Sequence, residues 1–255
     1  AVASIGKDVL SPSRNRSVLL GLVRSENSPK ATRFELRSPN PHTNTYLCLS
    51  AIYQCMLDGI DYALKSGKTS KDLEAEFTKP YGQPSDYLEA NRLYRCEEDI
   101  FEDMSEDERD NLFGTPPATV YDSMKNFISA DSVTDILCAG DVFNDMILAS
   151  YSHAMLDKWQ YELLERIIPS NLVTIRGYVK RHNTSNSVDD ELWNDIENLR
   201  MSLAKNTDET TSVFTSIKHA IEDKNLKDIS RLQIRMNNAM AELNALYKEY
   251  CDNQI

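Results

Sequence analysis

The chain has 255 residues, of which 41% are hydrophobic, and a formal net charge of −12 at pH 7. This length accommodates one large domain or two smaller ones, whereas the acidic balance excludes a nucleic-acid-binding protein, because phosphate backbones require a basic face. No apolar run approaches the ~18 residues of a membrane span. Five cysteines without a C-x-x-C pair predict reduced thiols of a cytoplasmic protein rather than a zinc site or a disulfide framework.

Two short segments near the N-terminus predict β-strands. Residues 17–23 are mostly apolar, as in a strand that is buried on both faces. In the segment Arg-Phe-Glu-Leu-Arg, alternation puts Arg33, Glu35 and Arg37 on one face of a strand, about 7 Å apart. By itself this pattern predicts a half-exposed strand with a solvated row of ion pairs. Since two strands alone are marginal in water, we expect them to belong to a larger sheet.

Most of the following chain is predicted to be helical. A long apolar helix is expected over 45–66, ending at Gly67, a usual residue just after a helix. Within 68–99 we expect a short acidic helix, then a loop rich in Pro and Gly, then a further helix. That further helix would run through Leu88, Leu93 and Cys96.

The next segments combine surface charge with two more helices. The acidic run 99–110 predicts a solvated loop and a helix N-terminus. A helix is expected over 119–127 and another over 144–168, where Pro169 should terminate it because proline cannot continue a helical hydrogen-bond ladder. Trp159 and Trp193 lie on apolar helix faces and are expected in a core.

Residues 170–255 carry apolar stripes at helical spacing. One stripe consists of Leu192, Ile196, Leu199 and Leu203. A longer one consists of Ile229, Leu232, Met236, Ala239, Leu243, Leu246 and Tyr250. The segment between them, with Val213, Ile217 and Ile221, has a plausible helix start at Asp208 and Glu209. Short connections favour an antiparallel three-helix bundle with ordinary core packing over a dimerising coiled coil.

Five short motifs occur in order within about 45 residues of the N-terminal part, which limits the false-positive risk of any single one. They are Asn15-Arg16-Ser17, Ser28-Pro29-Lys30-Ala31, the Arg33–Arg37 strand with Pro39 and Pro41, Tyr46-Leu47 after Asn44, and Leu57-Asp58-Gly59-Ile60. Together they resemble the C-terminal part of a glutamine synthetase catalytic domain. Gly140-Asp141-Val142-Phe143 continues the resemblance, which covers roughly residues 11–165.

The resemblance implies an α+β fold, with a few strands of the catalytic sheet followed by a mostly helical region. It divides the chain into residues 1–169, the catalytic portion, and 170–255, a helical extension that ends in the bundle. It also implies ATP-dependent ligation of ammonia to glutamate through γ-glutamyl phosphate. Such phosphoryl transfer needs arginines to neutralise anions and a carboxylate to hold a divalent metal.

The resemblance also implies roles for single residues. Glu35 would ligate Mg²⁺ or Mn²⁺, while Arg16 and Arg37 would be the catalytic and substrate-binding residues that contact glutamate and phosphate. The residues expected to bind ATP are Lys30, Arg33 and Arg24. One position departs from the family pattern, since Gly21 stands where the family usually has another arginine. The segment around Phe101 corresponds to one in which regulated bacterial members carry an adenylylated tyrosine, so we expect that control to be absent.

The first residues lack the charged and apolar regions typical of a signal peptide and run straight into family sequence, so we expect a cytoplasmic fragment of a longer homo-oligomeric enzyme. The fragment should be inactive alone, because the family's upstream metal ligands and N-terminal domain are not in it. Two alternatives remain open. The parent could be a γ-glutamyl ligase of the same fold that uses an amine instead of ammonia, or residues 170–255 could serve as a helical assembly module without catalysis of its own.

Overall fold

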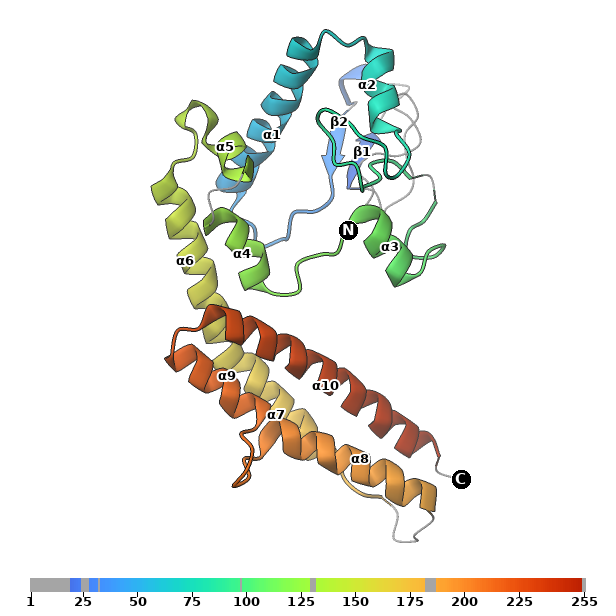
Figure 1. Ribbon diagram of the computed structural model, residues 1–255, viewed down its shortest axis with the longest axis vertical. Helices are drawn as coiled ribbons and strands as arrows, with labels where there is room; N and C mark the ends of the chain where they lie inside the picture. The colour runs from blue at the N-terminus through green and yellow to red at the C-terminus, as the bar shows by residue number, and fades with distance from the viewer. Residues whose placement is uncertain are drawn as a thin grey trace. The chain divides into compact units, whose positions relative to one another are not determined.

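The computed structural model describes residues 19–23, 28–31, 33–96, 98–128, 132–181 and 187–253. Over these ranges the chain is an α+β protein, mostly helical, with one two-stranded sheet (Figure 1). Its packing forms two compact units: unit 1 comprises residues 1–116 and 135–142, and unit 2 comprises 117–134 and 143–255. The predicted division at residue 169 follows the family resemblance rather than the packing, and it stays a prediction.

Unit 1 contains the sheet. β1 (Leu20–Val23) pairs antiparallel with β2 (Arg33–Leu36), so that Gly21 lies opposite Glu35. The single turn of 3-10 helix η1 (Pro29–Ala31) lies between them. The backbone N–H of Arg37 donates to the carbonyl of Leu19 at 2.9 Å, which extends the ladder by one bond. Both predicted strands are therefore confirmed over these residues.

The long helix α1 (Thr45–Ser66) has the predicted bounds. Asn44 caps its start by accepting the backbone N–H groups of Tyr46 and Leu47. Gly67 ends it with a φ of 65°, a left-handed conformation that glycine adopts without steric cost. The amide of the buried Gln54 donates to backbone carbonyls at the end of α5 (Ser132–Cys138) and in the 3-10 turn η2 (Ala139–Asp141).

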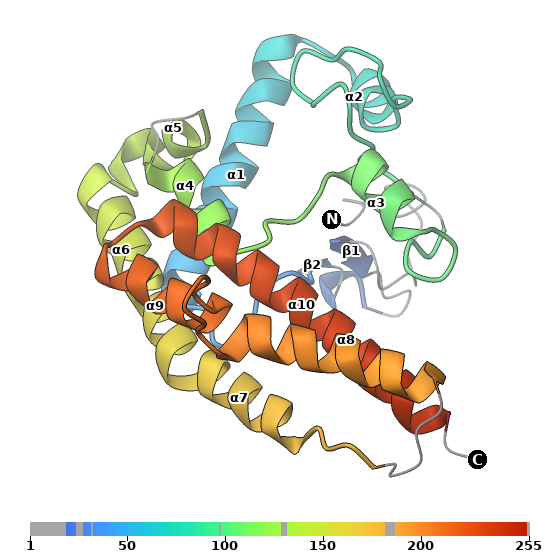
Figure 2. The same ribbon diagram turned by 60° about the horizontal axis from the view of Figure 1, so that its bottom comes forward.

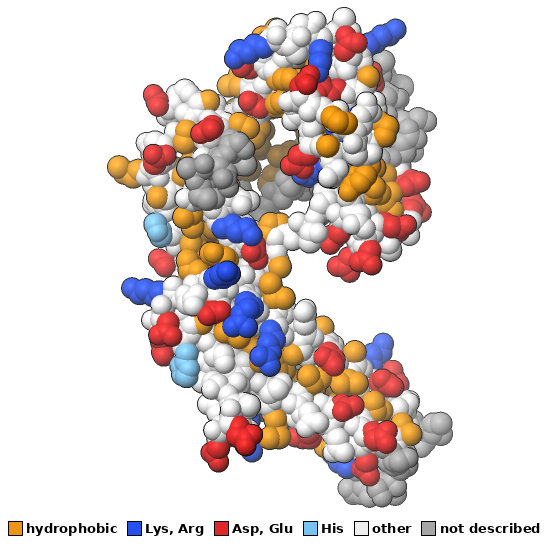
Figure 3. Space-filling view, viewed as in Figure 1, with side chains coloured by type: hydrophobic (Ala, Val, Ile, Leu, Met, Phe, Trp, Pro, Cys, Tyr) orange, Lys and Arg blue, Asp and Glu red, His pale blue; other side chains and the backbone are white. Residues whose placement is uncertain are grey.

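Two short helices of unit 1 begin at capping boxes. In each box the side chain of the cap residue accepts the backbone N–H of the residue three positions later, whose own side chain accepts the backbone N–H of the cap residue. In α2 (Ser70–Phe77) the pair is Thr69 and Asp72, and in α3 (Glu106–Phe113) it is Ser105 and Glu108. Asp and Glu side chains gather over α3 in Figure 3, as expected of the solvated acidic run.

The further helix predicted through Leu88, Leu93 and Cys96 is wrong, because these residues form an irregular segment. Its backbone finds partners elsewhere. The ammonium group of Lys79, a residue only 5% exposed, donates to the carbonyls of Ala90 and Arg92, and the N–H of Leu93 donates to the carbonyl of Leu112. Backbone groups that are satisfied in this way need no helical ladder.

Unit 2 begins with α4 (Val120–Ile128), which is within one residue of its predicted bounds, and continues through α6 (Asp145–Glu162), which starts within one residue of its predicted start. The prediction that Pro169 ends this second helix is wrong. The π-helical turn η3 (Leu163–Ile167) leads directly into α7 (Ile168–Gly177), with Pro169 in its first turn. Proline is tolerated there, because the first turn of a helix leaves N–H groups without intrahelical acceptors.

The C-terminal helices are α8 (Ser187–Ala204), α9 (Val213–Glu222) and α10 (Leu226–Asp252). α8 and α10 run side by side in opposite directions, with α9 against both (Figures 1 and 2). The predicted helix start at Asp208 is wrong: α9 begins after Ser212, whose hydroxyl accepts the N–H of Thr215.

The predicted apolar stripes meet inside unit 2. The fully buried side chains of this core include Ile196, Leu203, Ile217, Ile229, Met236, Leu243 and Tyr250. Residues of α4, α6 and α7 join the same core, among them Trp159 at 4% exposure. Ordinary core packing within one chain is therefore confirmed for both stripes. No helix in the described ranges is long and apolar enough to cross a membrane. None of the five cysteines, all of which lie in these ranges, forms a disulfide bond.

Candidate functional site

The charged face of β2 is the candidate site that the sequence predicts. The period of two puts Glu35 and Arg37 on the same side of the strand. The Nε atom of Arg37 donates to an Oε atom of Glu35 at 3.3 Å. The Arg37 side chain is 22% exposed and that of Glu35 is 47% exposed, so both functional groups remain within reach of a ligand.

Two further predicted cations lie close to this pair in the chain. Arg33 is exposed at the start of β2, and one of its terminal nitrogens lies 3.4 Å from the carbonyl of Ala31. Lys30 is exposed in η1. Arg16 and Arg24, the other predicted site residues, lie outside the described residues. The structure thus brings Glu35 and Arg37 into contact. Lys30 and Arg33 are exposed to solvent and lie a few residues earlier in the chain.

The chemistry of the donor set limits what metal this face could hold alone. Mg²⁺ takes oxygen ligands in near-octahedral geometry, usually one or two carboxylates together with phosphates and water. Glu35 fits one such ligand position. The described part of the chain contains no group of three or more His, Cys, Asp or Glu side chains that could complete a metal site. The remaining ligands would therefore have to come from elsewhere.

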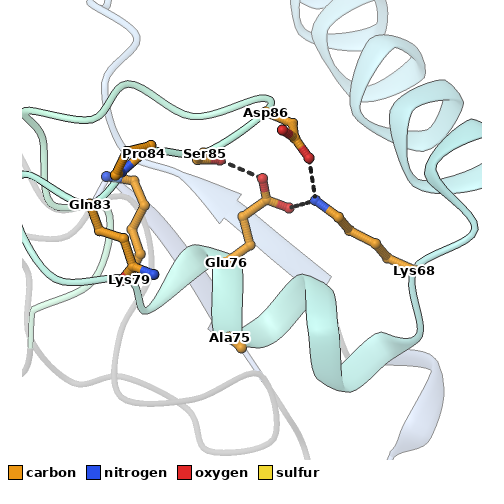
Figure 4. Close-up of a pocket in the computed structure, with 8 residues that line it drawn as sticks. All are labelled: Lys68, Ala75, Glu76, Lys79, Gln83, Pro84, Ser85 and Asp86. Carbon is orange, nitrogen blue, oxygen red and sulfur yellow. Dashed lines mark hydrogen bonds and ion pairs between the residues drawn. The ribbon is translucent and has the colours of Figure 1, made fainter.

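A second polar cluster was not predicted from the sequence. It lines a pocket of about 330 Å³ between α2 and the loop after it (Figure 4). At its centre the Glu76 carboxylate accepts hydrogen bonds from Ser85, Lys68 and Tyr62. Burial alone would raise the pKa of the Glu76 carboxyl, but these hydrogen bonds outweigh it and lower that pKa.

The same cluster extends back to α1. Lys68 donates to the Tyr62 hydroxyl at 2.6 Å, and the hydrogen bonds to Tyr62 and Glu76 raise the pKa of Lys68. Tyr62 stacks on Tyr87, which donates to Asp58 at 2.6 Å. Because the charges of this cluster satisfy one another, it ties α1, α2 and the loop together. Its members lie on α1, on α2 and in the loops that follow these helices, and they share no spacing motif, so no sequence pattern predicted the cluster.

The segment that contains β1 and β2 is similar to known proteins. Residues 11–83 match the family described as glutamine synthetase, catalytic domain. Over 80 residues, the chain is 39% identical to the glutamine synthetase of Escherichia coli strain K12 and 38% identical to that of Salmonella typhimurium strain LT2. The identity to the glutamine synthetase of Streptomyces filamentosus is 38% over 61 residues.

The similarity is limited to one part of each protein. The aligned region is 30% of this chain but only 17% of the Escherichia coli protein, and for the Streptomyces protein the shares are 24% and 13%. The chain therefore aligns with less than a fifth of the length of these relatives. No solved structure matches the chain significantly. The resemblance predicted for residues 84–165 lies beyond the matched family segment and stays a prediction.

Proposed function

We propose that this chain, whose residues 11–83 match the glutamine synthetase catalytic domain, is the C-terminal part of a glutamate–ammonia ligase. The reaction would form glutamine from glutamate, ammonia and ATP. The observation that carries the proposal is the pairing of Glu35 and Arg37 on the exposed face of β2, inside the segment that matches the catalytic domain. This is the arrangement that the chemistry needs, with a cation for an anionic substrate beside a carboxylate for a metal.

In the proposed reaction the γ-carboxylate of glutamate attacks the terminal phosphorus of ATP and ADP leaves. Ammonia then attacks the acyl carbon and phosphate leaves. The first step brings two anions together and the second expels anionic phosphate, so positioned cations supply much of the catalysis. The planar guanidinium of Arg37 can hold a carboxylate by two parallel hydrogen bonds and stays charged throughout. Lys30 and Arg33 would contact ATP, as would Arg24, and Arg16 would contact glutamate and the transferring phosphate.

Glu35 would contribute one ligand to bound Mg²⁺ or Mn²⁺, which would neutralise phosphate charge. Since the described residues offer no further carboxylates or histidines grouped with it, we propose that the other protein ligands lie in a longer protein or in a neighbouring subunit. We therefore propose that the active form is a cytoplasmic homo-oligomer of a longer chain, and that the 255 residues alone do not catalyse the reaction. Phe101, which is 60% exposed, has no hydroxyl to modify, so we also propose that control by adenylylation is absent.

Comparing the longer protein with the isolated 255-residue chain tests this proposal. Both are supplied with ATP, glutamate and ammonia, and glutamine is quantified directly. We expect glutamine from the longer protein and none from the isolated chain. In a parallel reaction a polyamine replaces ammonia. A γ-glutamylated polyamine without any glutamine would show that the parent is an amine ligase. Glutamine formed by the isolated chain would contradict the proposal that these 255 residues do not catalyse the reaction alone.

A further inference from the structure

Among the described glycines, only Gly21 has a side chain packed closely over its Cα position. It lies in β1 opposite Glu35 of β2, and the guanidinium group of Arg37 covers it. A Cβ atom built on Gly21 would lie 2.6 Å from Nη2 of Arg37, 3.1 Å from Cζ and 3.4 Å from Nε. At the other described glycines, the nearest such atom is the Tyr87 hydroxyl, 3.8 Å from a Cβ on Gly59.

The backbone does not explain a glycine at this position. Gly21 belongs to a regular antiparallel ladder and is not among the described glycines with positive φ, which are Gly67, Gly82, Gly114 and Gly140. Any residue could adopt its conformation. What the position lacks is room for a side chain, and the atoms that occupy the room belong to Arg37.

We infer that Gly21 is a positioning residue for Arg37: by having no side chain, it lets the guanidinium lie against β1 while Nε donates to Glu35. The inference rests on the proposed function, in which Arg37 contacts glutamate. A long side chain at position 21 would compete with Arg37 for the same space.

The geometry makes the inference testable by a small change. In Gly21→Ala the added methyl group meets the far end of a flexible side chain rather than the backbone. The Arg37 side chain can shift without moving the backbone, so the sheet should survive while the guanidinium moves. This variant should therefore change the orientation of Arg37 without changing the stability of the fold. Most substitutions of buried residues change both.

The first measurement is the ¹H–¹⁵N spectrum of arginine Nε groups in the 255-residue chain, in which Arg37→Lys identifies the Arg37 signal by its loss. We expect Gly21→Ala to move that signal towards those of solvated arginines without lowering the thermal unfolding midpoint. The control Gly177→Ala, where a Cβ meets no atom within 4 Å, should leave it in place. An unmoved Arg37 signal in Gly21→Ala would overturn the inference.

If Gly21→Ala does not fold, the double variant with Arg37→Ala decides the question. Removing the guanidinium removes the clash, so the double variant should fold. A double variant that also fails to fold would show that Gly21 is needed by the strand itself, and the positioning role would be overturned.

The second measurement is made in the longer protein. Since a misplacement of about 1 Å in a positioned group can cost about 10²-fold in rate, we expect Gly21→Ala to lower kcat/KM for glutamate by about this factor. The KM for ATP should not change, and on the Arg37→Ala background Gly21→Ala should have no further effect. If Arg37→Ala impairs the enzyme but Gly21→Ala does not, the positioning role is overturned and the proposed function stands. If Arg37→Ala has no effect on kcat/KM, the proposed function fails. The arginine Nε spectrum then decides by itself whether Gly21 positions Arg37.

Discussion

Replacing Leu243 by aspartate should unfold unit 2 and leave unit 1 folded. Leu243 lies in the middle of α10 and is 0% exposed. Truncating such a leucine to alanine costs about 2–5 kcal/mol, and a carboxylate without a partner in the same place adds several kcal/mol more. A typical domain is stable by about 5–15 kcal/mol, so this one substitution removes most or all of that stability.

Both tryptophans of the chain, Trp159 and Trp193, contribute to the core of unit 2, so their fluorescence reports on that unit alone. We expect the Leu243→Asp variant to show red-shifted, solvent-exposed emission and a partial loss of helical circular dichroism. Because α4 and α6 share this core, the loss should exceed the signal of residues 170–255. The control Ala245→Asp, at an exposed position of the same helix, should behave like the unsubstituted chain.

Light scattering on the same samples tests the alternative. If the apolar stripe on α10 instead packed against a second copy of the chain, Leu243→Asp would leave the tryptophan emission and the helix content nearly intact. The molar mass of the particle in solution would fall to half that of the unsubstituted protein. That combination of results would refute the packing described for unit 2.

Two further predictions concern the polar groups of each unit. Because its folded-state pKa is lowered, Glu76 stabilises unit 1 at pH values above about 5, and this contribution is lost as the pH falls through the lowered pKa. Glu76→Gln should therefore lower the thermal unfolding midpoint of unit 1 at pH 7, and that midpoint should fall less steeply as the pH is lowered. A plot of midpoint against pH that runs parallel to that of the unsubstituted chain would contradict this prediction. Gln233 accepts from the indole of Trp159 at 2.7 Å, so Gln233→Leu should destabilise unit 2 by about 1–3 kcal/mol in denaturant unfolding; an unchanged midpoint would contradict the role of this bond.

The features predicted correctly from the sequence depend on neighbouring residues. The helix between Asn44 and Gly67 is flanked by its own caps, and the stripes of α8 and α10 repeat with the period of a helix. The contact of Glu35 with Arg37 likewise follows from alternation along one strand. In these cases local chemistry and the final structure agree.

The features that were missed depend on residues distant in sequence or on unusual helix geometry. The segment through Leu88 is irregular because Lys79 and Leu112 satisfy its backbone. The π-helical turn before Pro169 lets one helix lead into the next, which a rule about proline does not foresee. The contact of Gly21 with Arg37 requires the register of two paired strands, and neither strand alone encodes that register.

The role of Arg37 in turnover is the most direct test of the account. In the longer protein, Arg37→Ala should lower the rate of glutamine formation by about 10²–10³-fold, as expected when one group that stabilises transition-state charge is lost, and should leave the thermal unfolding midpoint nearly unchanged. The matched control is Arg231→Ala on α10, where an exposed arginine pairs with Asp228 at 3.1 Å; it should retain full activity. Near-normal turnover of Arg37→Ala, or activity lost only because the protein unfolds, would contradict the account and leave Arg37 as one half of a solvated ion pair.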